Sequence, residues 1–262
     1  MKKVMFAAAV AAGLVAFGDG IESANVVGYV EKAKVSGYNF ACYGSMFVKP
    51  GTTSYSLADL KITGPANKNI ARQNYIQFFA AGTAAKFDSS RSYYYFGGTW
   101  YQRGATAASD VAIADPSTVT MDAGVGFLAA LPLAAAKVTY SGEVISADEQ
   151  KLVLAKPTGV NFFVASNPSV SDITLSQVTI TGPANKNIAR QNYIQFFAAG
   201  TAAKFDASRS YYYFGGTWYQ RGATAASDVA IADPTTVTIG AGEGFLVAFP
   251  LATARLNFPT SL

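Results

Sequence analysis

The sequence predicts an all-β protein built from two tandem β-sandwich-like units. Three observations predict this fold. The stretch from Ile62 to Ala134 returns at Ile180 to Ala252 with seven substitutions in 73 positions, so one structural unit is used twice. Half of the residues are hydrophobic, and 13% are aromatic. Short segments rich in β-branched and aromatic residues alternate with Gly, Pro, Asn and Asp, which is typical of strands joined by tight turns.

The repeat extends upstream of the nearly identical stretch. Segment 37–40 aligns with segment 159–162 once a gap of four residues is allowed. We expect the first unit to run from Ala24 to Ala136 and the second from Lys137 to Leu262. Each is then about 110 residues long, the size of one β-sandwich domain. The pattern leaves open whether the units fold separately or interleave into one body.

The N-terminal residues are typical of a secretory signal peptide. Two lysines precede an unbroken apolar run from Val4 to Phe17. We expect a signal peptide over residues 1–18, cleaved after Gly18, with a cut after Ser23 or Ala24 as the alternative. The run is too short to span a bilayer, which needs roughly 20 residues. The mature chain is therefore expected to be secreted or held at the cell surface, without a transmembrane segment.

Strand signals follow one another along the first unit and into the start of the second. We expect strands at Val26–Glu31, Asn39–Tyr43, Asn74–Phe79, Ser92–Phe96, Thr99–Arg103, Phe127–Leu131 and Val138–Ile145. Helix is expected only as single turns, at Ser56–Leu60 and Ser146–Lys151. The uncharged segment Asn74–Phe79 is predicted to be an internal strand, and the alternative is an edge strand recruited in assembly.

The strongest local signal is an aromatic hairpin at residues 93–101, copied at 211–219. Gly97 and Gly98 separate two aromatic segments, which is the signature of a two-residue turn whose central positions both need positive φ. This turn fixes the register, so that Tyr95 faces Trp100 and Tyr94 faces Tyr101.

The register divides the aromatic side chains between two faces of the hairpin. Buried aromatic rings stabilise a domain of this size substantially, so one face is assigned to the core. That face carries Tyr93, Tyr95 and Trp100. The other face is the candidate exposed binding surface, for a glycan, for the other unit or for a neighbouring chain. Its residues in the two copies are Tyr94, Phe96, Tyr101, Tyr212, Phe214 and Tyr219.

Several short elements resemble a known group of proteins. They are the segments 26–29 and 37–40, the aromatic hairpin with its Trp, the run 241–245, and the run 141–144. Together they are similar to secreted, uncharacterised repeat proteins of the Verrucomicrobia group of bacteria. The resemblance implies export and a β-rich fold, and it brings no activity. Unit one departs from the pattern, because Val125 stands where unit two has Glu243.

One common source of catalytic chemistry is missing from this sequence. The chain contains no histidine, which removes the commonest general base and metal ligand. We expect no catalytic residues, no metal and no cofactor. The carboxylates Asp88, Asp110 and Asp115 and their copies lie beside Ser or Pro, where Asp typically closes a turn or caps a helix. Gly124 and Gly126 form a G-x-G that leads into a strand, so a turn or bulge is expected.

The charges and the single cysteine limit the kinds of partner that the sequence predicts. Net charge is about +2 once the signal peptide is removed, and the cations are scattered, so nucleic acid is not an expected partner. Cys42 aligns with Val164, which predicts a packing position rather than a disulfide. The sequence therefore predicts a non-catalytic structural or adhesive protein that binds itself or cell-envelope components. The alternative is a glycan-binding module with two equivalent weak sites.

Overall fold

The computed structural model describes residues 27–258 except 35, 36, 38, 50, 51, 70, 71, 81, 83–85, 145–152, 156–160, 199, 201 and 252. The fold is all-β, and its only helices are single 3₁₀ turns within these described ranges. The predicted signal peptide, its cleavage site and the expected turn at Ser146–Lys151 lie outside them. No helix of the described part is long and apolar enough to cross a membrane.

The first unit contains twelve strands and three 3₁₀ turns within the described residues. In chain order they are β1 Val27–Ala33, β2 Phe40–Gly44, β3 Phe47–Val48, β4 Ser54–Ser56, η1 Leu57–Asp59, β5 Leu60–Thr63, β6 Tyr75–Ala80, β7 Lys86–Phe96, β8 Thr99–Gln102, η3 Ala107–Ser109, β9 Val111–Ala112, η4 Pro116–Thr118, β10 Thr120–Asp122, β11 Gly126–Ala130 and β12 Lys137–Val144.

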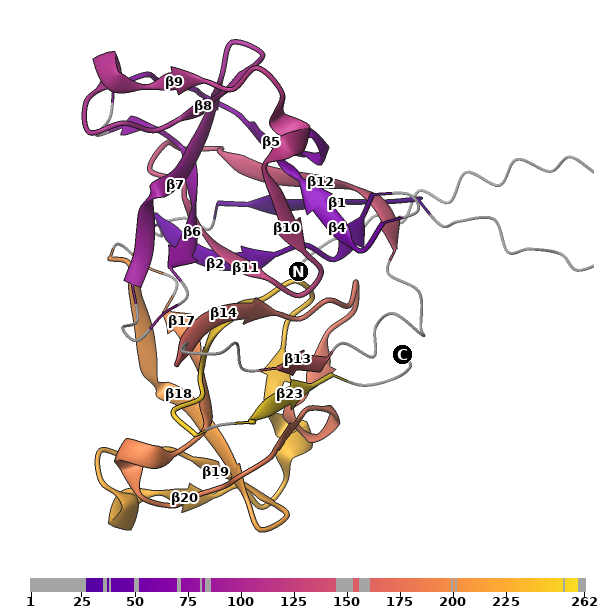
Figure 1. Cartoon of the computed structure of the whole chain (residues 1–262), viewed down its shortest axis with the longest axis vertical. Coiled ribbons are helices and arrows are strands. Elements are labelled where there is room, and N and C mark those ends of the chain that lie inside the picture. Colours follow the sequence, from indigo (N-terminus) through magenta and orange to yellow (C-terminus); the bar gives the residue numbers. More distant parts are fainter. Residues whose placement is uncertain are drawn as a thin grey trace, which may run out of the picture.

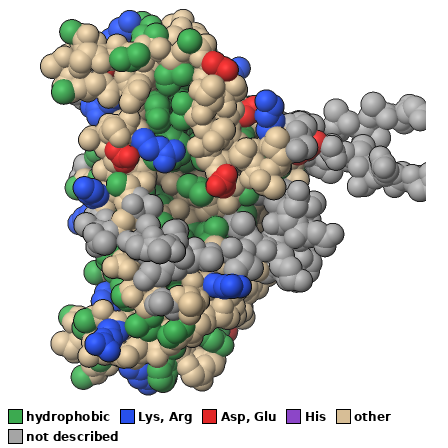
Figure 2. All heavy atoms as spheres, viewed as in Figure 1, with side chains coloured by type: hydrophobic (Ala, Val, Ile, Leu, Met, Phe, Trp, Pro, Cys, Tyr) green, Lys and Arg blue, Asp and Glu red, His purple; other side chains and the backbone are tan. Residues whose placement is uncertain are grey.

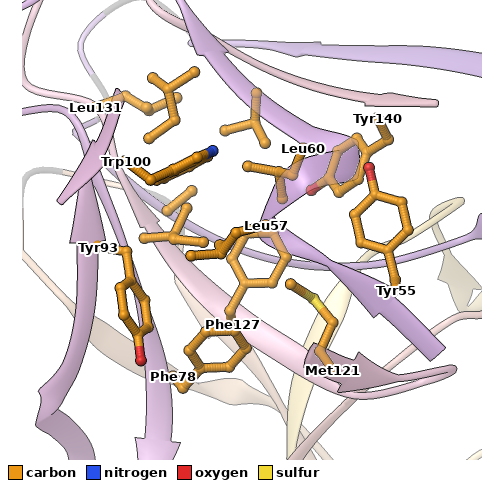
Figure 3. Close-up of a cluster of buried hydrophobic side chains, with 14 of the residues drawn as sticks. Tyr55, Leu57, Leu60, Phe78, Tyr93, Trp100, Met121, Phe127, Leu131 and Tyr140 are labelled. Carbon is orange, nitrogen blue, oxygen red and sulfur yellow. The ribbon is translucent and has the colours of Figure 1, made fainter. Parts of the chain in front are cut away.

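These strands form one large antiparallel sheet and two smaller ones. The large sheet has the order β2-β11-β6-β7-β8-β9, and β12 pairs with β1 on one side and with β5 and β3 on the other. Strands β4 and β10 pair separately. The core lies between the large sheet and the smaller ones, which is the arrangement of a β-sandwich. In Figure 3, Trp100, Phe78 and Phe127 of the large sheet point toward Leu57, Leu60 and Tyr140.

The second unit repeats this build. Its elements are β13 Val153–Ala155, β14 Phe162–Ser166, β15 Ile173–Thr174, η5 Leu175–Gln177, β16 Thr179–Thr181, η6 Ile188–Arg190, β17 Tyr193–Ala198, β18 Lys204–Phe214, β19 Thr217–Gln220, η7 Ala225–Ser227, β20 Val229–Ala230, η8 Pro234–Thr236, β21 Thr238–Ile239, β22 Gly244–Ala248 and β23 Arg255–Asn257. Its large sheet has the matching order β14-β22-β17-β18-β19-β20.

The structure confirms the expected strands and corrects two boundaries, the start of one strand and the border between the units. The segment predicted to be internal forms β6, between β11 and β7. Strand β7 begins at Lys86, six residues before the expected start. The predicted boundary after Ala136 is wrong, because β12 pairs with three strands of the first unit. The repeat identity fades at Ala134, and the sequence does not show that the next strand folds back onto β1.

A seam of reciprocal contacts joins the two units. Phe40 exchanges backbone hydrogen bonds with Gly200, at 3.0 and 3.2 Å, and the equivalent Phe162 exchanges bonds with Gly82, at 2.9 and 3.1 Å. Among the described residues, every sheet takes its strands from one unit, and isolated bridges cross the seam. The units are therefore two sandwiches placed face to face around an approximate two-fold axis (Figure 1).

The seam is apolar. Its buried members are Cys42, Phe79 and Leu128 from unit one with Val164, Phe197 and Leu246 from unit two. Cys42 is 4% exposed, as expected for a packing position. The rings of Phe87 and Phe205, which are equivalent residues, stack with centroids 6.2 Å apart. The half of each large sheet that begins with β2 or β14 is thus covered on both faces, by its own core on one side and by the other unit on the other.

Candidate functional site

The candidate surface lies on the β7–β8 hairpin, whose register agrees with the prediction. Tyr95 pairs with Trp100 and Tyr94 pairs with Tyr101. Gly97 and Gly98 have φ of 58° and 86°, the left-handed values that a two-residue turn of this type requires. Hairpin β18–β19 has the same pairing in unit two. The sequence therefore determined which residues share a face.

The face assigned to the core is buried. Tyr93 is 7% exposed and Trp100 is 4% exposed, and both belong to the main core cluster. Tyr95 is half-buried and packs against this cluster, with its ring centroid 5.4 Å from that of Trp100. This part of the prediction is confirmed, and the copies Tyr211 and Trp218 are buried in the same way.

The face expected to be exposed is partly covered, and the expectation is wrong for Tyr94 and Tyr212. Both are 1% exposed. The Tyr94 ring stacks on Tyr101 with centroids 5.1 Å apart and planes at 14°. Its hydroxyl donates to Asp110 Oδ2 at 2.7 Å. Burial first, and then this hydrogen bond to a carboxylate, raise the pKa of Tyr94 above its ordinary value.

Asp110 holds the buried Tyr94 in place from the loop that follows β8. Its Oδ1 accepts from the Gly104 N–H at 2.8 Å, and its Oδ2 also accepts from Gln73 Nε2 at 3.3 Å. Arg103 Nε donates to Gln73 Oε1 at 2.7 Å. Asp228 makes the equivalent set of bonds in unit two. The carboxylate is therefore an anchor for the hairpin, which extends the turn role that the sequence suggested.

Phe96 and Tyr101 remain half-exposed, and a lysine lies over both rings. Lys68 Nζ is 4.6 Å from the Tyr101 centroid and 5.2 Å from the Phe96 centroid. Lys68 is itself exposed. An exposed contact of this kind contributes about 0.5–1 kcal/mol, so a ligand could displace the ammonium at small cost. Tyr101 is thus held between Tyr94 and a removable cation.

Unit two reproduces this cluster almost unchanged. Lys186 Nζ is 4.5 Å from the Tyr219 centroid and 5.2 Å from the Phe214 centroid. It also donates to the Tyr219 hydroxyl at 3.3 Å. We call the half-exposed Phe96, Tyr101 and Lys68, with their copies Phe214, Tyr219 and Lys186, the hairpin clusters. Sequence reasoning missed the lysines, because each lies in a loop 33 residues before the tyrosine it covers.

The carboxylates Asp88 and Asp115 close turns, as expected. Asp88 accepts from the backbone N–H and the hydroxyl of Ser90, and Asp115 accepts from the same two groups of Ser117. These bonds, with the serine hydroxyl the largest contribution, lower the pKa of both carboxyls. No group of three His, Cys, Asp or Glu residues in the described ranges could hold a metal ion.

The molecular surface shown in Figure 2 carries isolated charges. Lys and Arg side chains are scattered over this face, with fewer Asp and Glu side chains between them, and they do not gather into one large patch. Comparisons with protein-family models, with curated proteins and with solved structures find no match for this chain. The resemblance to secreted Verrucomicrobia repeat proteins therefore stays a prediction.

Proposed function

We propose that this protein is a non-catalytic secreted or cell-surface protein with a structural or adhesive role, and that it joins two partners through its hairpin clusters. One observation carries the proposal. The approximate two-fold axis puts β8 and β9 at one end of the long axis and β19 and β20 at the other (Figure 1). Two equivalent surfaces at opposite ends of a molecule cannot both contact the same flat partner. They are therefore suited to joining two separate partners.

The state of the six repeat aspartates singled out in the sequence supports a role without catalysis. A glycosidase needs one carboxylic acid whose pKa is raised, so that it carries a proton near neutral pH. Asp88, Asp115, Asp206 and Asp233 have lowered pKa values because neighbouring hydroxyls and backbone N–H groups donate to them. Asp110 and Asp228 are committed to the hairpin tyrosines.

Bridging is tested with variants that lose one cluster or both. At ~1 µM, where each chain carries two clusters, the full chain is expected to aggregate cell-envelope particles, whereas Phe96→Ala and Phe214→Ala singly retain binding and lose aggregation. The double variant loses both. Tyr29→Ala is the matched control, because Tyr29 is 61% exposed away from the hairpins. Equal aggregation by the single variants and the unaltered protein would contradict the proposal.

The alternative, a glycan-binding module with two weak sites, is favoured by the half-exposed rings of the hairpin clusters. A sugar ring stacks on such a surface through its apolar face. Trp100 is a poor reporter, since it is buried on the opposite face of the hairpin. Titration calorimetry with neutral and acidic polysaccharides is the better measurement. Two equivalent sites lost together in the double variant would support this function, and no heat across the panel would exclude it.

A further inference from the structure

The seam between the units is a self-complementary surface with two equivalent notches, each formed at a glycine. A Cβ added to Gly244 would lie 2.6 Å from Cys42 Sγ, and a Cβ added to Gly126 would lie 2.4 Å from Val164 Cγ1. Cys42 and Val164 are equivalent residues, as are Gly126 and Gly244. Each unit therefore inserts one side chain into a glycine notch of the other. The G-x-G stretches supply these notches, together with the turns that the sequence predicted.

The symmetry breaks where equivalent positions 44 and 166 meet. A Cβ on Gly44 would lie 1.9 Å from Ser166 Oγ and 2.3 Å from Ser166 Cβ. Unit one carries glycine at this position and unit two carries serine. Two second units pressed together in the same way would place serine against serine in a space that holds one side chain. The seam thus accepts a first unit with a second unit and rejects two second units.

Nothing in these contacts requires both units to come from one chain. Every sheet of the described part is completed within one unit, so a unit can leave the seam without losing a strand. The contacts of an exchanged pair would be the same as those of the monomer. Only the covalent connection favours the monomer, and a short covalent connection is equivalent to roughly millimolar partner concentration.

We infer that, at about millimolar concentration, a second copy of the chain replaces the chain's own second unit on this surface. The first unit of each copy pairs with the second unit of the other, which gives a closed dimer with two complete seams. Because pairs of second units are rejected, first units find second units in both the monomer and the dimer. This association is independent of the hairpin clusters, and it would double the number of clusters on one particle.

Gly244→Cys reports the exchange directly. Its thiol would lie close enough to Cys42 for a disulfide across the seam, the Cβ–Sγ separation in a disulfide being about 3 Å. The full chain is refolded with a glutathione redox buffer at ~1 µM and at ~1 mM, concentrations that bracket the linker effect. The disulfide should stay within one chain at the low concentration. At the high concentration it should link two chains into a covalent dimer on a non-reducing gel.

Gly126→Cys is the matched control. It occupies the equivalent notch, but Val164 faces it, so it should form no disulfide across the seam and measures non-specific cross-linking. Sizing of the unaltered chain after the same refolding is the second measurement, and it does not depend on either variant folding. A concentration-dependent dimer supports the inference. A monomer at every concentration, or no more covalent dimer in Gly244→Cys than in Gly126→Cys, overturns it.

Discussion

The two units follow one chain path, but the core of the first is more polar than the core of the second. Tyr43, Tyr55 and Tyr140 pack in or against the first core. The equivalent positions of the second unit hold Ala165, Ile173 and Phe258, which belong to its core cluster. The fold therefore does not depend on these hydroxyl groups. What the two cores share at these positions is an apolar side-chain surface, and neither the hydroxyl groups nor the side-chain volumes are conserved between the units.

The units also differ in one surface pair. Arg209 Nη1 lies 2.7 Å from Glu243 Oε1, whereas the equivalent Arg91 has Val125 at the position of Glu243. Both arginines still lie over a phenylalanine ring, Arg91 over Phe78 at 4.4 Å and Arg209 over Phe196 at 4.1 Å. The ring contact is thus common to the two units, and the ion pair is an addition in the second.

The largest effect is expected where the units meet. Gly44→Ser should lower the free energy of unfolding by about 3 kcal/mol, because its Cβ would overlap Ser166 and lie 2.7 Å from the Val125 carbonyl oxygen. Adding Ser166→Gly should restore more than half of the loss, a coupling of roughly 1.5–2 kcal/mol in urea unfolding. Gly82→Ser is the control, since the nearest atom to its Cβ would be 3.8 Å away. Equal losses in the single and double variants would refute direct contact.

Alkaline pH should distinguish the two cores. Burial raises the pKa of Tyr43 to about 12, and it raises the pKa values of Tyr55 and Tyr140 further. Because the folded state favours the neutral phenol, this stability is complete below pH ~10, the pKa of an unfolded tyrosine, and is lost as pH rises beyond it. Burial also raises the pKa of Tyr211 in the second core, but that core has no counterpart of these three tyrosines, so residue-resolved hydrogen exchange should show unit one opening first above pH ~10.

Two variants sharpen this prediction. The Tyr140 hydroxyl is buried without a hydrogen-bond partner, so Tyr140→Phe should raise stability by about 1 kcal/mol at pH 7 and shift the alkaline limb to higher pH. The Tyr55 hydroxyl donates to the Asp59 carbonyl oxygen, so Tyr55→Phe should cost about 1 kcal/mol at pH 7. Losses of the same size in both variants would show that the Tyr140 hydroxyl is satisfied.

The smallest effect is expected at the surface pair. Glu243→Val recreates the arrangement of unit one and should cost at most about 1 kcal/mol, since both side chains are partly exposed. Part of that cost is the Gly240 N–H, which donates to Glu243 Oε2 at 2.8 Å. Urea unfolding at low salt and at ~1 M salt checks this, because salt screens the ion pair and should shrink the difference.

The sequence predicted the hairpin but not which of its faces lie in solvent. Successive side chains of a strand point to opposite faces of the sheet, and the Gly97–Gly98 turn sets the pairing of the two strands. Together these two rules determine which side chains share a face. They say nothing about what covers that face. Tyr94 is covered by a carboxylate 16 residues later and by Tyr101, and the first half of the same sheet face is covered by the second unit. Such long-range contacts leave no periodic signal, so a single sequence cannot show them.

The seam shows what is gained when two equivalent halves share one polypeptide. In a dimer of identical subunits, any replacement on the axis occurs on both sides at once, so a bulky residue there meets itself. Here Gly44 and Ser166 are encoded separately, so one unit could carry a serine side chain at this position while the other kept a glycine. Genetic fusion therefore permits asymmetric fitting at the very point where identical subunits are most constrained.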